Sequence, residues 1–195
     1  MLTEHQYGDA AKLIACDVPS VKAVAQVEAN GNGFLKDGRP KILFEGHVFW
    51  KQLLKNGIDP QSIQVGNEDI LYPVWDPAKV RKYYNMDQYA RLEKAKQINE
   101  DAALKSASWG AFQIMGFNYA ACGYNSVQNF VDAQSDDYNQ LLSFCNYIKK
   151  VHLNVNLQHQ DWKGFARGYN GPDYWKNQYD IKLKNAYDGF KNQII

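Results

Sequence analysis

The sequence predicts a mainly helical α+β domain that carries one small β-hairpin. Apolar residues recur at the three- and four-residue spacing of amphipathic helices in several segments, and this spacing is the main sequence signal for helix. One β-favouring run, Ile42-Leu43-Phe44, follows the turn signal Lys36-Asp37-Gly38. A chain of 195 residues with 45% hydrophobic content is long enough for one well-buried core and short for two. We therefore expect a single domain over residues 1–195.

The charge balance argues against several classes of protein. The 22 Lys and Arg residues nearly match the 21 Asp and Glu residues, so the chain lacks the basic surface with which proteins usually bind nucleic acid. It also lacks a polybasic membrane patch, and no stretch approaches the ~20 apolar residues needed to span a bilayer. The first residues contain acids and no sustained apolar run, unlike a secretory signal. We expect a protein made in the cytoplasm that binds neither nucleic acid nor membrane.

The first predicted helix covers residues 18–29 and has a carboxylate in its last turn. Asp17 suits the N-cap, and Gly31 or Gly33 suits the helix stop. The apolar residues of the inner face recur at helical spacing and are Val21, Val24 and Ala25. Glu28 continues the same face, so its carboxylate points inward or into a cleft.

This position gives Glu28 two interpretations. The negative end of the helix dipole and partial burial both disfavour a charged carboxylate, so both raise its pKa. A general acid that works near neutral pH requires such a raised pKa. The alternative is a glutamate that bends out to solvent or caps a neighbouring loop, and the helix alone favours neither interpretation.

A short strand or hairpin leads from the turn at residues 36–38 to a second glutamate, Glu45. The next helix starts with the residues His47, Phe49 and Trp50. A lone glutamate after an apolar run is usually a solvated or capping residue. By itself, Glu45 is therefore weak evidence for catalysis.

The rest of the first half contains a long connection and one helix. Residues 58–80 have no clean period and are rich in proline, which predicts a connection with short turns. Asp87 is expected to cap a helix over residues 88–107, with a charged side facing solvent. Its partial apolar face consists of Tyr89, Leu92, Ala95 and Ala103.

The second half contains two clear scaffold helices. One starts after Ser135 or Asp136 and carries an apolar stripe of Tyr138, Leu141, Leu142, Cys145, Ile148 and His152. His152 is interpreted as a packed core residue. The other, in residues 179–195, carries Leu183, Ala186, Tyr187, Phe190 and Ile194. The three cysteines have no metal-ligand spacing and are interpreted as small buried hydrophobes.

Two further segments contain more polar groups and glycines than a scaffold needs. "SWGAFQIMGFNYAACGY", residues 108–124, sets Gln113 in an otherwise apolar run, and a buried or cleft-facing glutamine normally has a partner. "GFARGYNGPDYW", residues 164–175, ends a short helix in a turn that exposes the phenol of Tyr169 beside the amide of Asn170. Aromatic faces with nearby amides suit sugars, although for each segment taken alone core aromatics plus a tight turn is the favoured interpretation.

The order of these segments resembles that of the lysozyme-like superfamily. In its goose-type lysozymes and lytic transglycosylases, an acid glutamate is followed by a Gly-x-x-Gln segment and then by a Tyr-Asn turn. The motifs "VEANGNGF", "GRPKILFEGHVFW", "SWGAFQIMGFNYAACGY" and "FARGYNGPDY" more closely resemble the N-acetylmuramidase catalytic domain of phage endolysins. The resemblance covers about residues 8–190 and implies a lysozyme-like helical fold with the hairpin beside the active-site cleft.

The resemblance implies hydrolysis of the β-1,4 bond between N-acetylmuramic acid and N-acetylglucosamine in peptidoglycan. Glu28 matches the family's acid, and Glu45 matches the second motif acid as a base, a stabilising carboxylate or an anchor of the hairpin. A carboxyl separation of roughly 5 to 5.5 Å suits a retaining nucleophile, and roughly 6.5 to 9.5 Å suits an inverting base. The matching substrate-binding residues are Gln113, Ile114, Met115, Tyr169 and Asn170. No metal or cofactor is expected.

The biological setting follows from the same resemblance. We expect a monomer that is made in the host cytoplasm and acts on peptidoglycan glycan strands in the periplasm. Many endolysins carry a wall-binding module before the catalytic domain, so this chain is either naturally compact or an excised catalytic domain. Two other activities stay open, a lytic transglycosylase that cleaves the same bond and a non-catalytic module that binds peptidoglycan or chitin.

Overall fold

A computed structural model describes residues 2–29 and 33–193 and confirms a mainly helical chain with a small antiparallel sheet. The longer helices are α1 (Glu4–Ile14), α2 (Val18–Glu28), α3 (Gly46–Lys55), α4 (Pro77–Tyr84), α5 (Gln88–Lys96), α6 (Glu100–Lys105), α7 (Val127–Ala133), α8 (Asp137–Lys150), α9 (Asn154–Gln158), α10 (Trp162–Asn170) and α11 (Tyr179–Lys191). The 3-10 helices are η1 (Pro60–Ile63), η2 (Gly116–Asn118) and η3 (Tyr174–Asn177). The strands are β1 (Ile42–Phe44), β2 (Ala107–Trp109) and β3 (Ile114–Met115).

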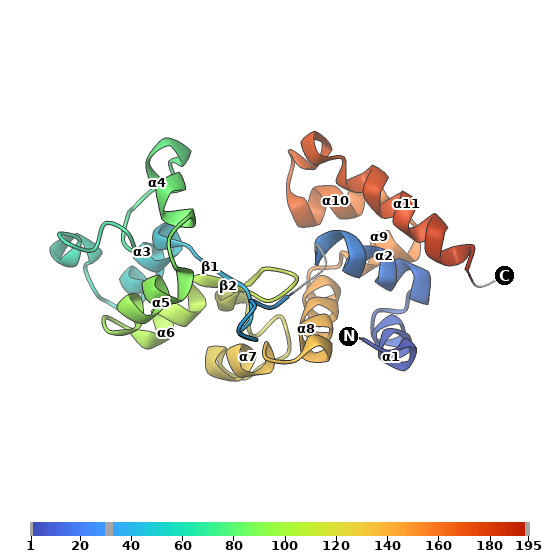
Figure 1. Ribbon diagram of the computed structural model, residues 1–195, viewed down its shortest axis with the longest axis horizontal. Helices are drawn as coiled ribbons and strands as arrows, with labels where there is room; N and C mark the ends of the chain where they lie inside the picture. Colours follow the sequence, from blue (N-terminus) through green and yellow to red (C-terminus); the bar gives the residue numbers. More distant parts are fainter. Residues whose placement is uncertain (1, 30–32, 194–195) are drawn as a thin grey trace.

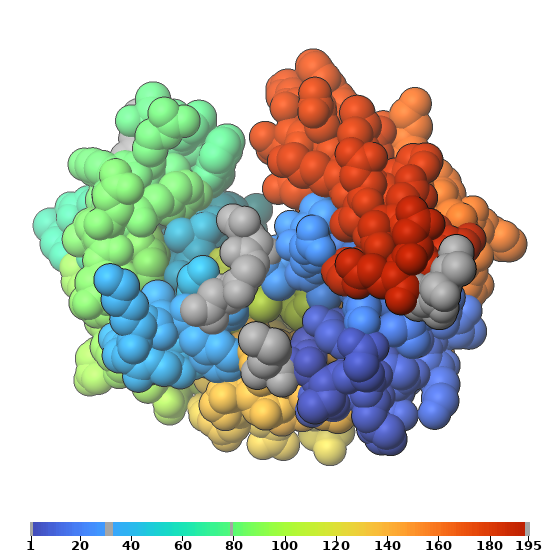
Figure 2. All heavy atoms as spheres, turned by 45° about the vertical axis from the view of Figure 1, so that its right-hand side comes forward, coloured from blue at the N-terminus to red at the C-terminus, as the bar shows by residue number. Residues whose placement is uncertain are grey.

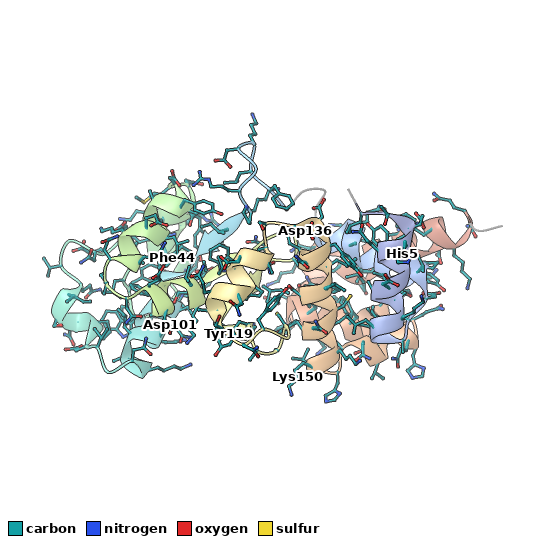
Figure 3. The ribbon with its side chains drawn as sticks, turned by 90° about the horizontal axis from the view of Figure 1, so that it is seen from below. His5, Phe44, Asp101, Tyr119, Asp136 and Lys150 are labelled. Carbon is teal, nitrogen blue, oxygen red and sulfur yellow. The ribbon has the colours of Figure 1, made fainter. Side chains whose placement is uncertain are left out.

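The helices form two groups with the sheet between them. Figure 1 shows α3 to α6 on one side and α1, α2 and α8 to α11 on the other, with β1 and β2 bridging the groups. Figure 3 places Phe44 of β1 within the first group and His5 of α1 at the opposite end of the molecule. One continuous cluster of buried apolar side chains runs through both groups. The two groups therefore share a core, and the sheet lies between them.

The sheet differs in detail from the predicted hairpin. The strand order is β1-β2-β3, and Leu43 pairs with Ser108 in an antiparallel register. Among the described residues 33–41, Phe34 and Pro40 form an isolated bridge around a turn in which Gly38 has φ +86°. The partner of β1 comes from a segment more than sixty residues away, which local turn signals do not reveal.

Helix α2 confirms the prediction for residues 18–29. The Asp17 side chain accepts a hydrogen bond from the backbone N–H of Ser20, as an N-cap should. The predicted inner face is buried, and α2 packs against α1 and α11. This packing fixes the direction in which the last turn of α2 points.

Four helices, α1, α4, α7 and α9, were absent from the sequence prediction. Helix α1 begins with a capping box in which the Thr3 and Gln6 side chains bond to each other's backbone N–H groups. Helix α4 starts at Pro77, inside the segment interpreted as a connection, and Asp76 caps it. Both starts carry recognisable local signals, a Thr-x-x-Gln pattern and an Asp-Pro pair.

The helix predicted over residues 88–107 is two helices. Asp87 caps α5 as expected, but the chain breaks after Lys96 and restarts as α6 with Asn99 as its own N-cap. The prediction of a solvated charged face is wrong for Arg91, which is 1% exposed. Its guanidinium is buried because backbone carbonyl oxygens accept its hydrogen bonds.

The second-half helices follow the prediction, with one correction. Asp136 caps α8, whereas His152 lies beyond the helix end at φ +62° and is exposed, so it is not a core residue. Cys122 and Cys145 are buried free thiols and Cys16 is half-buried. In α11 Leu183 and Tyr187 are buried, while the predicted contact of Ile194 lies outside the described residues. Among those residues, no helix has the length and apolar character to cross a bilayer.

Candidate active site

Glu28 occupies the last turn of α2 with its carboxyl group largely buried. Its Oε2 accepts a hydrogen bond of 3.0 Å from Asn170 Nδ2, and its Oε1 has no hydrogen-bond partner within the described part of the chain. Burial raises the pKa of Glu28 from 4.5 to about 7, against the opposing effect of the Asn170 hydrogen bond. Desolvation dominates because a single neutral amide only partly replaces the water that the carboxylate loses.

The Tyr-Asn turn lies opposite Glu28 at the end of α10. Gly171, at φ +88°, ends this helix, and a positive φ is a conformation that glycine adopts readily. Asn170 points its amide at Glu28, as described above. The Tyr169 hydroxyl, expected to be exposed, instead donates a hydrogen bond of 2.9 Å to the carbonyl oxygen of Phe112. The Tyr169 ring stacks on Phe165, so the phenol connects α10 to the segment before β3.

Gln113 lies in the tight turn between β2 and β3 with φ +49°. Its Nε2 donates to the Gly110 carbonyl oxygen at 2.8 Å, and its Oε1 accepts from Ser108 Oγ at 2.9 Å. The residue is exposed, so these bonds hold a side chain that faces solvent rather than the core. Ile114 is buried and Met115 is half-buried in the adjoining strand.

Two adjoining cavities meet at Glu28. The larger, of about 630 Å³, is lined by Val27, Glu28, Ala29, Leu35, Lys41, Ile42, Leu43, Gly110, Ala111, Gln113, Tyr179 and Lys182. The smaller, of about 370 Å³, is lined by Glu28, Phe112, Gln113, Ile114, Met115, Asn118, Tyr147, Tyr169, Asn170 and Tyr179. Figure 2 shows the surface hollowed between the region of α4 and the C-terminal helices. The predicted site residues other than Glu45 therefore surround one cleft.

Glu45 has a separate environment. It follows β1 at the N-terminal end of α3, yet its side chain makes no capping hydrogen bond. Its Oε2 accepts a hydrogen bond of 3.1 Å from the Tyr84 hydroxyl and lies 3.5 Å from His47 Nδ1. The Glu45 side chain is 16% exposed and is not among the residues that line either cavity around Glu28. Along the chain, Glu28 thus precedes the first strand of the sheet and Glu45 directly follows it.

Several residues of the cleft were not singled out in the sequence. Tyr179, at the start of α11, lines both cavities, and Lys41 and Lys182 bring two ammonium groups to the larger one. Tyr179 and Lys182 lie in a segment that reads as an ordinary amphipathic helix, and Lys41 carries no local signal. Only the packing of α11 on α2 brings the helical pair to Glu28. Over residues 2–29 and 33–193, no group of three or more His, Cys, Asp or Glu side chains is arranged to hold a metal ion.

The geometry around Glu28 suits proton donation. A carboxyl with a pKa of about 7 is roughly half protonated at neutral pH, whereas an exposed glutamic acid is almost fully ionised. The Oε1 oxygen is buried and accepts no hydrogen bond from the described residues, so a proton on the carboxyl is not bound to another protein group there. Amide and aromatic side chains around it offer hydrogen bonds and flat surfaces for a polar, ring-shaped ligand.

Comparisons with known proteins identify the family to which the chain belongs. The sequence matches the family model described as "Muramidase: N-acetylmuramidase" over residues 17–191. The fold is similar to that in the "Crystal structure of Burkholderia AP3 phage endolysin", with 37% sequence identity and a TM-score of 0.89. That similarity covers 98% of this chain and 72% of the other chain. No curated protein matches the sequence.

The match spans the segments that carry Glu28, Gln113 and Asn170, and so includes the whole cleft. Over that length both the sequence family and the fold agree. The chain therefore belongs to the N-acetylmuramidase family of glycoside hydrolases, whose substrate is peptidoglycan.

Proposed function

We propose that Glu28 is the general acid of this muramidase. In this role it protonates the glycosidic oxygen of the β-1,4 bond between N-acetylmuramic acid and N-acetylglucosamine. One observation carries the proposal: a largely buried carboxyl with a pKa of about 7 and one unpartnered oxygen lies where two cavities meet. A general acid must be protonated at the working pH and must reach the leaving-group oxygen.

The substrate-binding residues in this proposal are those of the smaller cavity. Asn170 lines this cavity and orients the Glu28 carboxyl, and its own Oδ1 is buried without a partner among the described residues. Gln113 presents a preorganised amide at the exposed edge, and Ile114 and Met115 form the apolar floor. Tyr169 contributes its ring, since its hydroxyl is bonded to Phe112.

Glu45 is the second carboxylate in this proposal. It acts on the sugar from the opposite side of the cleft, by activating water or by stabilising the oxocarbenium ion. The Tyr84 hydroxyl bonded to Glu45 supports this role because it keeps the carboxylate in one orientation.

The setting of the reaction follows from the similarity to a phage endolysin. We propose a monomeric catalytic domain formed by residues 1–195. It is made in a host cytoplasm, acts on glycan strands in the periplasm and has no nucleic-acid partner. The near-neutral charge balance supports the last point.

Clearing of purified peptidoglycan tests the roles of the two glutamates. Wild type should clear the suspension, and Glu28→Gln should lose about 10³-fold or more of that activity, because loss of general acid catalysis together with its positioned proton is severe. Glu45→Gln should lose at least about 10-fold. Glu93→Gln removes an exposed carboxylate on α5 and is the matched control. A folded Glu28→Gln variant that clears as fast as the control would refute the assignment.

Lytic transglycosylase chemistry is the second candidate. It needs one acid and no separate base, and the absence of Glu45 from the lining of the cavities around Glu28 favours it. Mass spectrometry of the released sugars separates the two reactions, because hydrolysis adds one water and leaves a reducing end. Products that lack that water and carry a 1,6-anhydro ring would show that the enzyme is a lytic transglycosylase and not a hydrolase.

A further inference from the structure

An unusual chain of hydrogen bonds leads from the surface to Glu45. Trp75 lies in the segment between Pro73 and Pro77 and is 50% exposed. Its Nε1 donates to the Tyr84 hydroxyl oxygen at 2.6 Å, and that hydroxyl contacts Glu45 Oε2 at 3.1 Å. The chain thus joins an exposed indole, a phenol on α4 and the proposed second carboxylate.

The direction of this chain is fixed by chemistry. An indole N–H only donates, so the Tyr84 oxygen must accept from Trp75. Tyr84 has a single hydroxyl proton, and a carboxylate only accepts, so that proton points at Glu45. Burial and the nearby Glu45 raise the pKa of Tyr84 to about 12 despite the Trp75 hydrogen bond, so the phenol keeps its proton. A displacement of the indole therefore moves the donor that orients Glu45.

The exposed ring of Trp75 offers a flat surface on which a ligand can stack. A half-exposed tryptophan beside Val74, which is 68% exposed, leaves apolar surface in water. The polar edge of the ring is held by Tyr84, so the ring is fixed in place. Helix α4, which carries Tyr84, faces α10 across the hollow of the molecule (Figures 1 and 2). A flat and partly exposed aromatic ring, joined through Tyr84 to the proposed second carboxylate, suits the apolar C–H face of a pyranose.

We propose that Trp75 is an outer glycan-binding platform and that Tyr84 is a positioning residue that couples it to Glu45. A sugar ring of the same peptidoglycan strand, one or more units from the cleaved bond, stacks on the Trp75 indole. Stacking holds the indole N–H on Tyr84, and Tyr84 then holds the Glu45 carboxylate in its working orientation. The enzyme thereby cleaves long strands faster than short fragments. The coupling rests on the proposed role of Glu45.

Three variants separate the platform from the coupling. Trp75→Ala removes ring and donor, Trp75→Phe keeps a flat ring without the N–H, and Tyr84→Phe removes only the hydroxyl. Tyr83→Phe is the matched control, since it removes a neighbouring hydroxyl from the same helix. Each variant is assayed on purified glycan fragments of increasing length, with folding checked by circular dichroism and thermal unfolding.

The platform predicts an effect on KM that depends on length. Trp75→Ala should raise KM about 3- to 10-fold for long fragments and leave it unchanged for fragments too short to reach Trp75. Trp75→Phe should keep KM within about 2-fold of wild type. An unchanged KM for Trp75→Ala at every length would overturn the platform.

The coupling predicts an effect on kcat. Tyr84→Phe and Trp75→Phe should each lower kcat about 3- to 10-fold with little change in KM, while Tyr83→Phe behaves as wild type. In a Glu45→Gln background, Tyr84→Phe should cause no further loss, because both changes act on one carboxylate. If Tyr84 had only a structural role, Tyr84→Phe would instead lower stability, and it would lower kcat by the same factor in the wild-type and the Glu45→Gln backgrounds.

The outcomes distinguish this inference from the proposed function. If Glu45→Gln is impaired while Tyr84→Phe and Trp75→Phe match wild type, the coupling is wrong and the role of Glu45 stands. If Glu45→Gln itself matches wild type, the role of Glu45 is wrong and the coupling fails with it. The dependence of KM on fragment length then still shows whether Trp75 is an outer glycan-binding platform.

Discussion

The Asn170 amide donates to the Glu28 carboxyl at 3.0 Å, joining the C-terminal ends of α2 and α10 across 142 residues of sequence. Both helix ends carry the partial negative charge of exposed carbonyls, and that charge disfavours an ionised carboxylate. Burial is the main cause that raises the pKa of Glu28 to about 7, and the amide hydrogen bond opposes it only in part. The arrangement fixes the acid in position without forcing it to ionise.

Activity should therefore fall as the pH rises above about 7. The proton that Glu28 donates is absent once its carboxyl ionises, so the alkaline limb of kcat/KM should follow a pKa of about 7. The measurement is the initial rate on soluble glycan fragments across a range of buffers at constant ionic strength. A rate that stays flat well above pH 7 would show that another group supplies the proton.

Stability should depend on pH in the opposite sense to most carboxylates. The pKa of Glu28 rises from 4.5 to about 7 on folding, so between these values the folded protein binds more protons than the unfolded chain. Its contribution to the free energy of unfolding is fully present below pH 4.5 and is lost as the pH rises through 7. The loss amounts to about 3 kcal/mol.

The neutral variant Glu28→Gln escapes this loss. It should be more stable than wild type at pH 8 and lose most of that advantage near pH 4.5, as judged by urea unfolding at both values. Other groups also titrate over this range, so the difference between the two proteins is the quantity to compare. An advantage that does not change with pH would mean that Glu28 ionises freely in the folded state.

Removal of the Asn170 amide should raise the pKa of Glu28 further. Its hydrogen bond favours the charged form of Glu28, so Asn170→Ala should raise the pKa of Glu28 and shift the alkaline limb of the rate profile to higher pH. The maximal rate should fall about 10-fold, since the acid loses its orientation. Asn146→Ala, which removes an amide bonded to the Cys122 carbonyl, is the control and should leave the limb in place. A shift to lower pH would contradict the role of the amide.

The sequence predicted the parts of the site that depend on local patterns. Helical spacing predicted that Glu28 lies on the inner face of α2, and Asp17 as N-cap predicted where that helix starts. The grouping of Glu28 with Gln113 and Asn170 depended on resemblance to a family, because no local rule connects segments so far apart. The expected exposure of the Tyr169 phenol was wrong for the same reason, since its acceptor is the distant Phe112 carbonyl.

Non-local contacts also explain the other differences. The partner of Glu45 is Tyr84, on a helix hidden in a proline-rich segment that has no clean period. Trp75, within that segment, is an aromatic residue between two prolines, and this is the one sequence signal that could have drawn attention to it. Helical spacing placed His152 on a buried stripe, but the helix ends before that residue. Periodicity predicts which face is buried only while the helix continues.

The burial of Arg91 gives the last prediction, which concerns the scaffold behind Glu45. The Arg91 guanidinium donates to the carbonyl oxygens of Phe44 at 2.9 Å and of Asp69 at 2.6 Å, so it ties β1 and the loop before α4 to α5. Arg91→Met keeps the length of the side chain but leaves these buried carbonyls unpaired, which should lower the free energy of unfolding by about 2–4 kcal/mol. Arg91→Lys should recover little of this, because an ammonium group does not reproduce the planar fork of donors. Urea unfolding measures the loss, and Arg39→Met, at an exposed arginine paired with Asp37, should change stability little. Equal stabilities of Arg91→Met and Arg39→Met would mean that the buried guanidinium does not hold the strand that leads to Glu45.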